Sequence, residues 1–314
     1  MQHKLFLLAA LVIAFAACND NEPQVINYYI DDNPAVVQGQ LSGKFSVSPT
    51  KKVSFSQGNL QYNAVQNVWR FATNQYDYVG DATMGTVKIG TTKCNNALIS
   101  NTYNGWIDLF GWGTGDNPTM SSTWYFDYPT FVDWGKNRIY NGGDKVNLWR
   151  TLTRDEWVYL FRGRKDAEKK FALGHIYLDA YKSDSVNGLF LLPDSWTKPA
   201  DIEFNLSVDK GLEWITSGYG DITYYTNDNL DNYNHNGYTL DEWKKLEDSG
   251  VVFLPAAGDR NSGTVVKNVG SSGYYRSATP YDTGNAYYLL FHSRDLHPHY
   301  YYDRSYGFSV RLVR

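Results

Sequence analysis

Two segments of this chain have the sequence pattern of a helix start. This small number limits the folds that the chain can adopt. Each is a capping box, Thr153-Arg154-Asp155-Glu156 in one case and Thr239-Leu240-Asp241-Glu242 in the other. In such a box the threonine hydroxyl accepts a hydrogen bond from the backbone N–H three residues on, and the glutamate accepts one from the threonine N–H. Apolar residues at helical spacing follow each box, beginning at Trp157 and Trp243. The sequence therefore predicts two helices.

Short β-strands account for most of the remaining pattern. Polar and apolar residues alternate at 44–47, 52–55 and 68–71, and turn residues separate these runs. After each helix comes a similar apolar hexapeptide, GLFLLP at 188–193 and GVVFLP at 250–255, which hints at a duplicated helix–strand unit. We expect further strands around 286–291 and 308–312, and long packed loops over residues 80–150. Few helices, many short strands and long loops predict an α+β fold.

The first residues predict an exported, lipid-anchored protein. Lys4 is followed by thirteen apolar residues, a signal-peptide pattern too short for a membrane-spanning helix, which needs roughly 20. We expect residues 1–17 to be removed, and Phe15-Ala16-Ala17-Cys18 resembles a bacterial lipobox with Cys18 as the lipidated residue. The alternative is ordinary signal cleavage beside an incidental cysteine. Residues 18–40 are predicted to be a flexible tether and residues 41–314 the folded domain, anchored in the outer membrane and exposed at the cell surface.

Composition narrows the classes of partner. The chain has two cysteines, so if Cys18 carries lipid, Cys94 has no disulfide partner. A net charge of -4 supplies no basic stripe for phosphates, so nucleic acid is not expected as a partner. The chain has 10 tryptophans and 26 tyrosines, and nine of the tyrosines lie between Tyr274 and Tyr306. Aromatic side chains serve binding faces as well as cores, and their concentration in the tail favours recognition there.

Several motifs resemble the C-type-lectin-like domains of Bacteroidetes surface lipoproteins, which are related to the Fibrobacter major paralogous domain and to the formylglycine-generating-enzyme fold. The resemblance covers roughly residues 50–314. It implies a small twisted antiparallel sheet with two helices and long loops. The motifs that carry it are SFSQGNLQY at 54–62, DLFGWGTG at 108–115, LTRDEW at 152–157, LLPD at 191–194, FLPAAG at 253–258 and GFSVR at 307–311.

The tail resembles the variable region of proteins that a diversity-generating retroelement alters at adenine positions, mostly in asparagine codons. Phe291, Ser293, Pro298, Arg304 and residues 307–311 match the fixed frame of such tails. An altered asparagine codon reaches Tyr, His, Asp, Ser, Leu and Arg but not Lys, Glu, Gln, Met or Trp, and residues 269–314 contain none of those five. The predicted ligand-binding segment is 276–306. Its candidate contact residues are Tyr281, Tyr288, Leu290, His292, Arg294, Asp295, His297, His299, Tyr300, Tyr301, Tyr302, Asp303, Ser305 and Tyr306.

The same tail indicates a contact surface without the resemblance. A strand over 288–294 places Tyr288, Leu290, His292 and Arg294 on one face, and Leu289, Phe291 and Ser293 on the other. The second face suits a core. The first mixes a ring, an aliphatic group, an imidazole and a guanidinium, and Tyr and Arg dominate binding hot spots. The competing interpretation is a Tyr-rich loop that only covers the domain's own surface.

The sequence does not predict a metal site. His297-Pro298-His299 with Asp295, Asp303 and His292 nearby matches no closed zinc or nickel pattern, so no metal or cofactor is expected. Asp228-Asn229 and Asp231-Asn232 show no clear calcium pattern and are interpreted as solvated loop residues.

An enzyme is also not expected. The fold relative that oxidises sulfatase cysteines uses a cysteine pair, whereas Cys94 stands alone here, and Glu156 and Glu242 both belong to capping boxes. We expect a surface-displayed lipoprotein that binds a protein or glycan ligand. Tyr rings and Arg294 would supply contact area, the histidines hydrogen bonds, and Asp295 and Asp303 charge complementarity. The alternatives are a fixed carbohydrate-binding adhesin with aromatic platforms, such as Trp106, Trp112 and Trp124, and an enzyme of the related fold.

Overall fold

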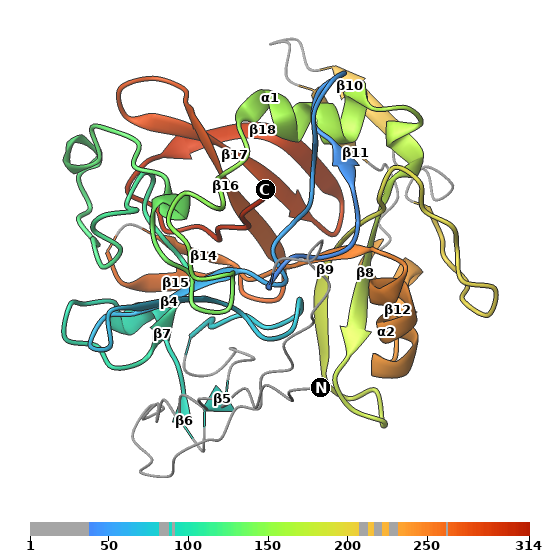
Figure 1. Ribbon diagram of the computed structural model, residues 1–314, viewed down its shortest axis with the longest axis horizontal. Helices are drawn as coiled ribbons and strands as arrows, with labels where there is room; N and C mark the ends of the chain where they lie inside the picture. Colours follow the sequence, from blue (N-terminus) through green and yellow to red (C-terminus); the bar gives the residue numbers. More distant parts are fainter. Residues whose placement is uncertain are drawn as a thin grey trace, which may run out of the picture.

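A computed structural model describes residues 38–81, 88–89, 92–206, 213–216, 222–225, 232–261 and 263–314 (Figure 1). The predicted signal peptide, Cys18 and nearly all of the tether lie outside these residues, as do Asp228, Asn229 and Asp231. Two α-helices and several small sheets make up the described part, which confirms the α+β class. No helix in the described ranges is long and apolar enough to cross a membrane.

A five-stranded sheet contains most of the predicted ligand-binding tail, and its strands lie in the order β10-β11-β18-β17-β16. All of its described pairings are antiparallel. In Figure 1 its red strands β16, β17 and β18 fill the upper centre, with α1 beside them. The strand bounds are β10 (Glu213–Thr216), β11 (Ile222–Tyr225), β16 (Ser272–Pro280), β17 (Asn285–His292) and β18 (Asp295–Asp303).

A four-stranded sheet, with the order β12-β8-β9-β13, holds the two similar hexapeptides. They pair as antiparallel neighbours, with Phe190 opposite Phe253 and Leu189 opposite Leu254. Both faces of this sheet are buried, because Leu189 and Phe190 enter different hydrophobic clusters. The strand bounds are β8 (Phe171–Tyr177), β9 (Ser185–Leu191), β12 (Gly237–Tyr238) and β13 (Val252–Pro255).

Both predicted helices begin at their capping boxes, so that prediction is confirmed. Thr153 and Thr239 each accept the backbone N–H of the glutamate three residues on and donate their own N–H to its carboxylate. The first helix is α1 (Arg154–Val158), which continues as a single π-helical turn, η4 (Tyr159–Gly163). The second is α2 (Leu240–Asp248), which packs near β8 and β12.

The remaining elements are short and belong mainly to the first half of the chain. As expected, residues 94–150 are mostly loop. A three-stranded sheet has the order β4-β3-β7, and three further sheets of the described residues have two strands each. The bounds are β1 (Phe45–Ser46), β2 (Lys52–Val53), β3 (Leu60–Asn63), β4 (Val68–Phe71), β5 (Lys88–Ile89), β6 (Thr92–Lys93), η1 (Asn96–Leu98), β7 (Trp106–Ile107), η2 (Tyr125–Asp127), η3 (Trp134–Lys136), η5 (Ala167–Lys169), η7 (Asn232–His235), β14 (Asp259–Asn261) and β15 (Val265–Lys267).

The last residues do not form the strand expected at 308–312. They make isolated bridges instead, with Phe308 opposite Phe110, Ser309 opposite Tyr275, and Val313 opposite both Phe55 and Arg150. The side chains of Phe308, Val310, Leu312 and Val313 are almost completely buried. The C-terminal segment therefore runs through the core and ties the N-terminal hairpins to β16, as its central position in Figure 1 shows.

Residues 295–303 form a strand that contains Pro298. Pro298 is tolerated because a β-bulge lies there: Tyr288 pairs with Tyr300 and Leu290 with His297, so Leu289 faces both Pro298 and His299. The extra residue reverses which side chains of β18 point to each face of the sheet. Asp295 and His297 before the bulge therefore share a face with Tyr300 and Tyr302 after it.

Candidate ligand-binding surface

The two faces of the five-stranded sheet differ in exposure. On the covered face, Leu289, Phe291 and Leu296 are completely buried in the main core together with Trp157 of α1. Gly273 of β16 lies opposite Phe291, and a Cβ there would come within 2.1 Å of that ring, so only glycine allows this packing. On the other face, which we call the open face, Leu290 and His292 are half-buried, and Tyr300 and Tyr302 are 41% and 45% exposed.

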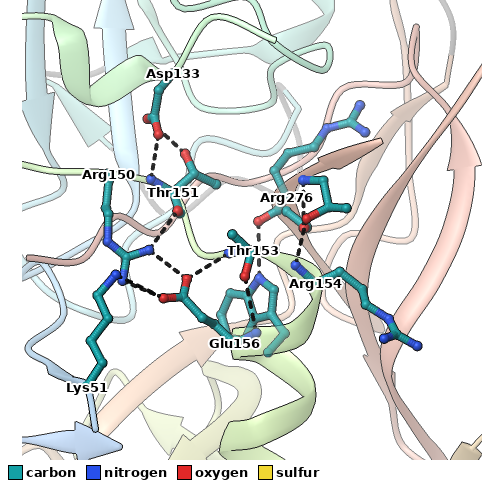
Figure 2. A network of polar contacts seen from close by, with 11 residues as sticks. Lys51, Asp133, Arg150, Thr151, Thr153, Arg154, Glu156 and Arg276 are labelled. Carbon is teal, nitrogen blue, oxygen red and sulfur yellow. Dashed lines mark hydrogen bonds and ion pairs between the residues drawn. The ribbon is translucent and has the colours of Figure 1, made fainter. Parts of the chain in front are cut away.

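A network around α1 fixes the covered face (Figure 2). The indole of Trp157 donates to the Arg276 carbonyl of β16 at 3.2 Å, and the Arg154 N–H donates to the Thr279 hydroxyl at 3.1 Å. Arg150 forms two hydrogen bonds to the Glu156 carboxylate, at 2.6 and 2.8 Å. Burial acts to raise the pKa of Glu156, but the hydrogen bonds from Arg150 and Thr153 outweigh it and lower that pKa. Glu156 is therefore a structural carboxylate that holds α1 in place.

The open face contains a hollow of about 290 Å³. Five of the predicted contact residues line it, and the others come from the β14–β15 hairpin and its surroundings, which the sequence did not indicate. A glycine turn at Gly263 between short polar–apolar runs was the available hairpin signal, but nothing local placed that hairpin beside β16. The lining residues are Asp259, Asn261, Lys267, Asn268, Tyr274, Tyr288, Leu290, Tyr300, Tyr302, Tyr306 and Phe308.

Aromatic rings dominate this hollow. Tyr288 lies edge-on to Tyr300, with ring centroids 5.8 Å apart and an interplanar angle of 77°, and it contacts Phe308 at 4.6 Å. Tyr302 and Tyr306 meet edge-to-face at 4.7 Å and 82°. Tyr274 stacks on Phe308, with ring centroids 5.1 Å apart and an interplanar angle of 21°. The rings that line the hollow therefore pack closely against one another.

Tyr288, His299 and Ser305 are not on the open surface, contrary to expectation. Tyr288 is 3% exposed, because Tyr274, Tyr300 and Phe308 pack around it at the floor of the hollow. His299 is 8% exposed. It lies in the β-bulge, where the regular alternation of side chains between the two faces of the sheet is interrupted. Ser305 is completely buried in the turn after β18, where its N–H donates to Asp303.

Three polar residues meet at one end of the open face. His292 Nε2 lies 2.9 Å from Asp295 Oδ2, and His297 Nε2 lies 3.9 Å from the same oxygen. Because His292 Nδ1 accepts the Arg294 N–H, its Nε2 carries the proton and donates to Asp295. Burial acts to raise the pKa of Asp295, but the two imidazoles outweigh it and hold that pKa below its ordinary value. Arg294 is exposed beside them at the β17–β18 turn.

Tyr281 and Tyr301 lie away from this hollow. Their rings stack at 3.8 Å and 9°, and Tyr287 meets Tyr281 edge-on at 5.3 Å. Tyr281 borders a second hollow of about 500 Å³, together with Phe126, Pro129, Pro280, Asp282, Thr283 and Arg304. The predicted contact residues are therefore divided between two surfaces.

Arg304 anchors the hairpin between them. It is 5% exposed, and its guanidinium donates to the carbonyls of Tyr128, Pro129, Asp282 and Asn285. It also lies over the Trp112 ring, 4.2 Å from the centroid. These bonds hold the ends of β17 and β18 while leaving Tyr300 to Tyr302 exposed.

The residues proposed for the alternative functions are placed differently. Trp106 and Trp112 are 6% and 3% exposed and cannot serve as open platforms, whereas Trp124 is 61% exposed. Cys94 is completely buried near Val79 and Trp106. Within the described ranges, no group of three histidine, cysteine, aspartate or glutamate side chains is arranged to hold a metal ion.

Comparison with known proteins gives one match of limited extent. A family model described as a domain of unknown function (DUF8237) matches residues 221–313. This stretch includes β11, α2, β13 and all three strands of the open face. Neither the curated proteins nor the solved structures gave a match. What this chain shares with known proteins is therefore similarity, over its last third, to a domain of unknown function.

Proposed function

We propose that this chain is a ligand-binding protein and that the open face of β16–β18 is its binding surface. The observation that carries the proposal is the contrast within single strands: Leu289 and Phe291 are completely buried, while the alternate residues Leu290 and His292 reach the surface. Tyr300 and Tyr302 extend that surface at 41% and 45% exposure. Exposed tyrosines on a rigid sheet favour recognition, because they offer large contact area at low entropic cost.

We further propose that the fold is C-type-lectin-like, that Cys18 is lipidated at the outer membrane, and that a retroelement diversifies the tail. Support for diversification is that the resembling fixed-frame residues Phe291, Pro298, Arg304 and Phe308 are all buried. If the buried residues stay fixed, the exposed residues between them can be substituted, because surface substitutions change stability little. The ligand is a protein or a glycan, and the chain acts by binding it, without catalysis.

Sequencing tests this proposal directly. The flanking DNA should contain a near-copy of the last hundred or so bases that differs at adenines, beside a reverse transcriptase gene. Tails from many isolates should differ at Leu290, His292, Arg294, Tyr300 and Tyr302. The matched controls are the buried neighbours Leu289, Phe291 and Leu296, which should stay constant. A tail that is invariant at both sets, with no near-copy nearby, would refute diversification.

A second candidate function is a fixed carbohydrate-binding adhesin, and the second hollow favours it. Trp124 and Phe126 are 61% and 55% exposed, and Phe126 lines that hollow together with Tyr281. Such rings are suited to stack on sugars. Glycan-array binding that is lost in Trp124→Ala and kept in Tyr302→Ala would favour this function over the open face. The reverse pattern would exclude it.

A further inference from the structure

The hollow on the open face has the composition of an aromatic cage. Six rings, from Tyr274, Tyr288, Tyr300, Tyr302, Tyr306 and Phe308, line a volume of about 290 Å³. Small-molecule sites usually measure about 300 to 1,000 Å³, so this hollow suits a single head group or one side chain. Tyr288 with Tyr300 and Tyr302 with Tyr306 meet at steep angles, whereas Tyr274 stacks on Phe308 at 5.1 Å and 21°, so the rings of the lining pack against one another in several orientations.

Asp259 is the acidic residue of the cage lining. It is 5% exposed, with one oxygen accepting a hydrogen bond from Asn268 at 2.7 Å. Burial is the main cause that raises the pKa of Tyr274, Tyr288 and Tyr306; neighbouring tyrosines and Asp259 add to it, while Arg276 acts to lower the pKa of Tyr288. Lys267 is the positive residue of the lining, and its side chain is exposed at the rim.

We propose that this cage binds an organic cation, an alkylammonium or guanidinium head group, with Asp259 as its counter-charge. The inference rests on the proposed function and names the ligand chemistry of the same surface. The negative face of an aromatic ring attracts a cation, and the attraction grows when water is excluded. The protein already uses this preference internally: Arg276 lies behind the cage, 4.2 Å from the centroid of the Phe308 ring, with its guanidinium bonded to backbone carbonyls.

The cage combines fixed and exchangeable parts. Phe308 belongs to the fixed frame that the tail resembles, and Asp259 and Tyr274 are not among the candidate varied positions. Tyr288, Leu290, Tyr300, Tyr302 and Tyr306 are among those positions. The counter-charge would then be common to every version of the tail. Other versions of the tail would have a different number of rings and therefore a different affinity for a cation.

The test is a titration of the full chain with choline and with 3,3-dimethylbutan-1-ol, which has the same shape without the charge. We expect choline to bind at least about tenfold more tightly, a difference of about 1.4 kcal/mol. Equal binding of the two compounds would overturn the proposal, because a merely apolar hollow does not distinguish them. Competition of choline by neutral methyl glycosides but not by Nα-acetyl-arginine amide would overturn it as well.

Two substitutions in the lining of the hollow should act in opposite directions. Asp259→Asn keeps the shape and the acceptor for Asn268 but removes the counter-charge, and it should weaken choline binding about tenfold. Lys267→Ala removes an exposed positive charge that repels choline, and it should strengthen choline binding severalfold. Weaker binding in Lys267→Ala would mean that the hollow prefers an anion or a neutral ligand. Tyr181→Leu is the matched control and should leave choline affinity unchanged, because Tyr181 is 92% exposed and does not line the hollow.

Two further arms separate the source of the cation and the two proposals. Tighter binding of Nα-acetyl-arginine amide than of phosphocholine would indicate a protein side chain, and the reverse a phosphocholine-bearing surface. Either result supports the cage. Tail sequences that vary between isolates, together with a failure to bind any cation, would reject the cage and leave the proposed function intact. An invariant tail together with choline binding would reject diversification and leave the cage intact.

Discussion

The two principal sheets of this protein are built from similar strands but are used differently. In the four-stranded sheet, Phe190 and Leu189 point to opposite faces and both are completely buried. In the five-stranded sheet, Leu289 is completely buried while the next residue, Leu290, lines a hollow on the open face. An antiparallel sheet can leave one face to solvent. The comparison indicates that the first sheet stabilises the molecule, while the second is supported on one face and free on the other.

The sharpest test of this contrast is truncation in the closed sheet. Phe190 packs against the rings of Phe204, Tyr238, Trp243 and Phe253 at centroid distances of 4.8–6.0 Å, the shortest being to Phe253. Phe190→Ala should lower the free energy of unfolding by about 3 to 5 kcal/mol, because it removes buried contacts and leaves a cavity. Urea unfolding followed by tryptophan fluorescence measures the loss. A cost below about 1 kcal/mol would contradict a supporting role for this sheet.

The loops around Asp108 should show a pH dependence of their own. Asp108 is completely buried and accepts hydrogen bonds from the Val79 N–H at 2.8 Å and from Asn96 Nδ2 at 2.9 Å. Burial raises its pKa from 3.8 to about 6. Because the folded state favours the protonated form, this stabilisation is complete below about pH 4 and is lost as the pH rises through about 6. The loss should be on the order of 3 kcal/mol.

The matched variant for this prediction is Asp108→Asn, which cannot ionise. Its absolute stability should fall, because an amide N–H would face the Asn96 amide. The difference in free energy of unfolding between wild type and variant should shrink as the pH rises from 4 to 7. If that difference stays constant with pH, Asp108 does not change protonation on folding in this range.

The two helix caps offer a smaller, matched comparison between the sheets. Thr153 caps α1, which covers the five-stranded sheet, and Thr239 caps α2, beside the four-stranded sheet. Thr153→Ala and Thr239→Ala should each lower the free energy of unfolding by about 1 kcal/mol, because each leaves a backbone N–H without its acceptor. Serine at either position keeps the hydroxyl and should recover most of the loss. Alanine variants as stable as wild type would show that the caps do not contribute.

The smallest expected effect is on the open face. Tyr302 is 45% exposed, and Tyr302→Ala should lower the free energy of unfolding by less than about 1 kcal/mol. Thermal unfolding beside Phe190→Ala gives the direct contrast between the two sheets. A large loss in Tyr302→Ala would mean that the tyrosines cover the protein's own surface, and it would remove the distinction between a supporting sheet and a binding sheet.

Local patterns in the sequence correctly predicted several parts of the structure. Both helix starts were predictable because a capping box joins residues only three apart, and both boxes are formed. The burial of Leu289 and Phe291 was predictable because side chains along a strand alternate between faces. The α+β class followed from the same signals. Each of these predictions depends on interactions within a few residues of one another.

The shape of the candidate site was decided only by the tertiary structure. The bulge at Pro298 and His299 arises where β18 pairs with β17, and it puts Tyr300 on the open face while burying His299. Asp259 and Lys267 come to the hollow because the β14–β15 hairpin lies beside β16, and Arg260 in that hairpin bridges to Gly307. Such placements depend on pairings between distant residues, which local propensity does not encode. The sequence by itself determined which side chains of residues 288–291 alternate between core and surface, and packing determined which residues of the tail meet around one hollow.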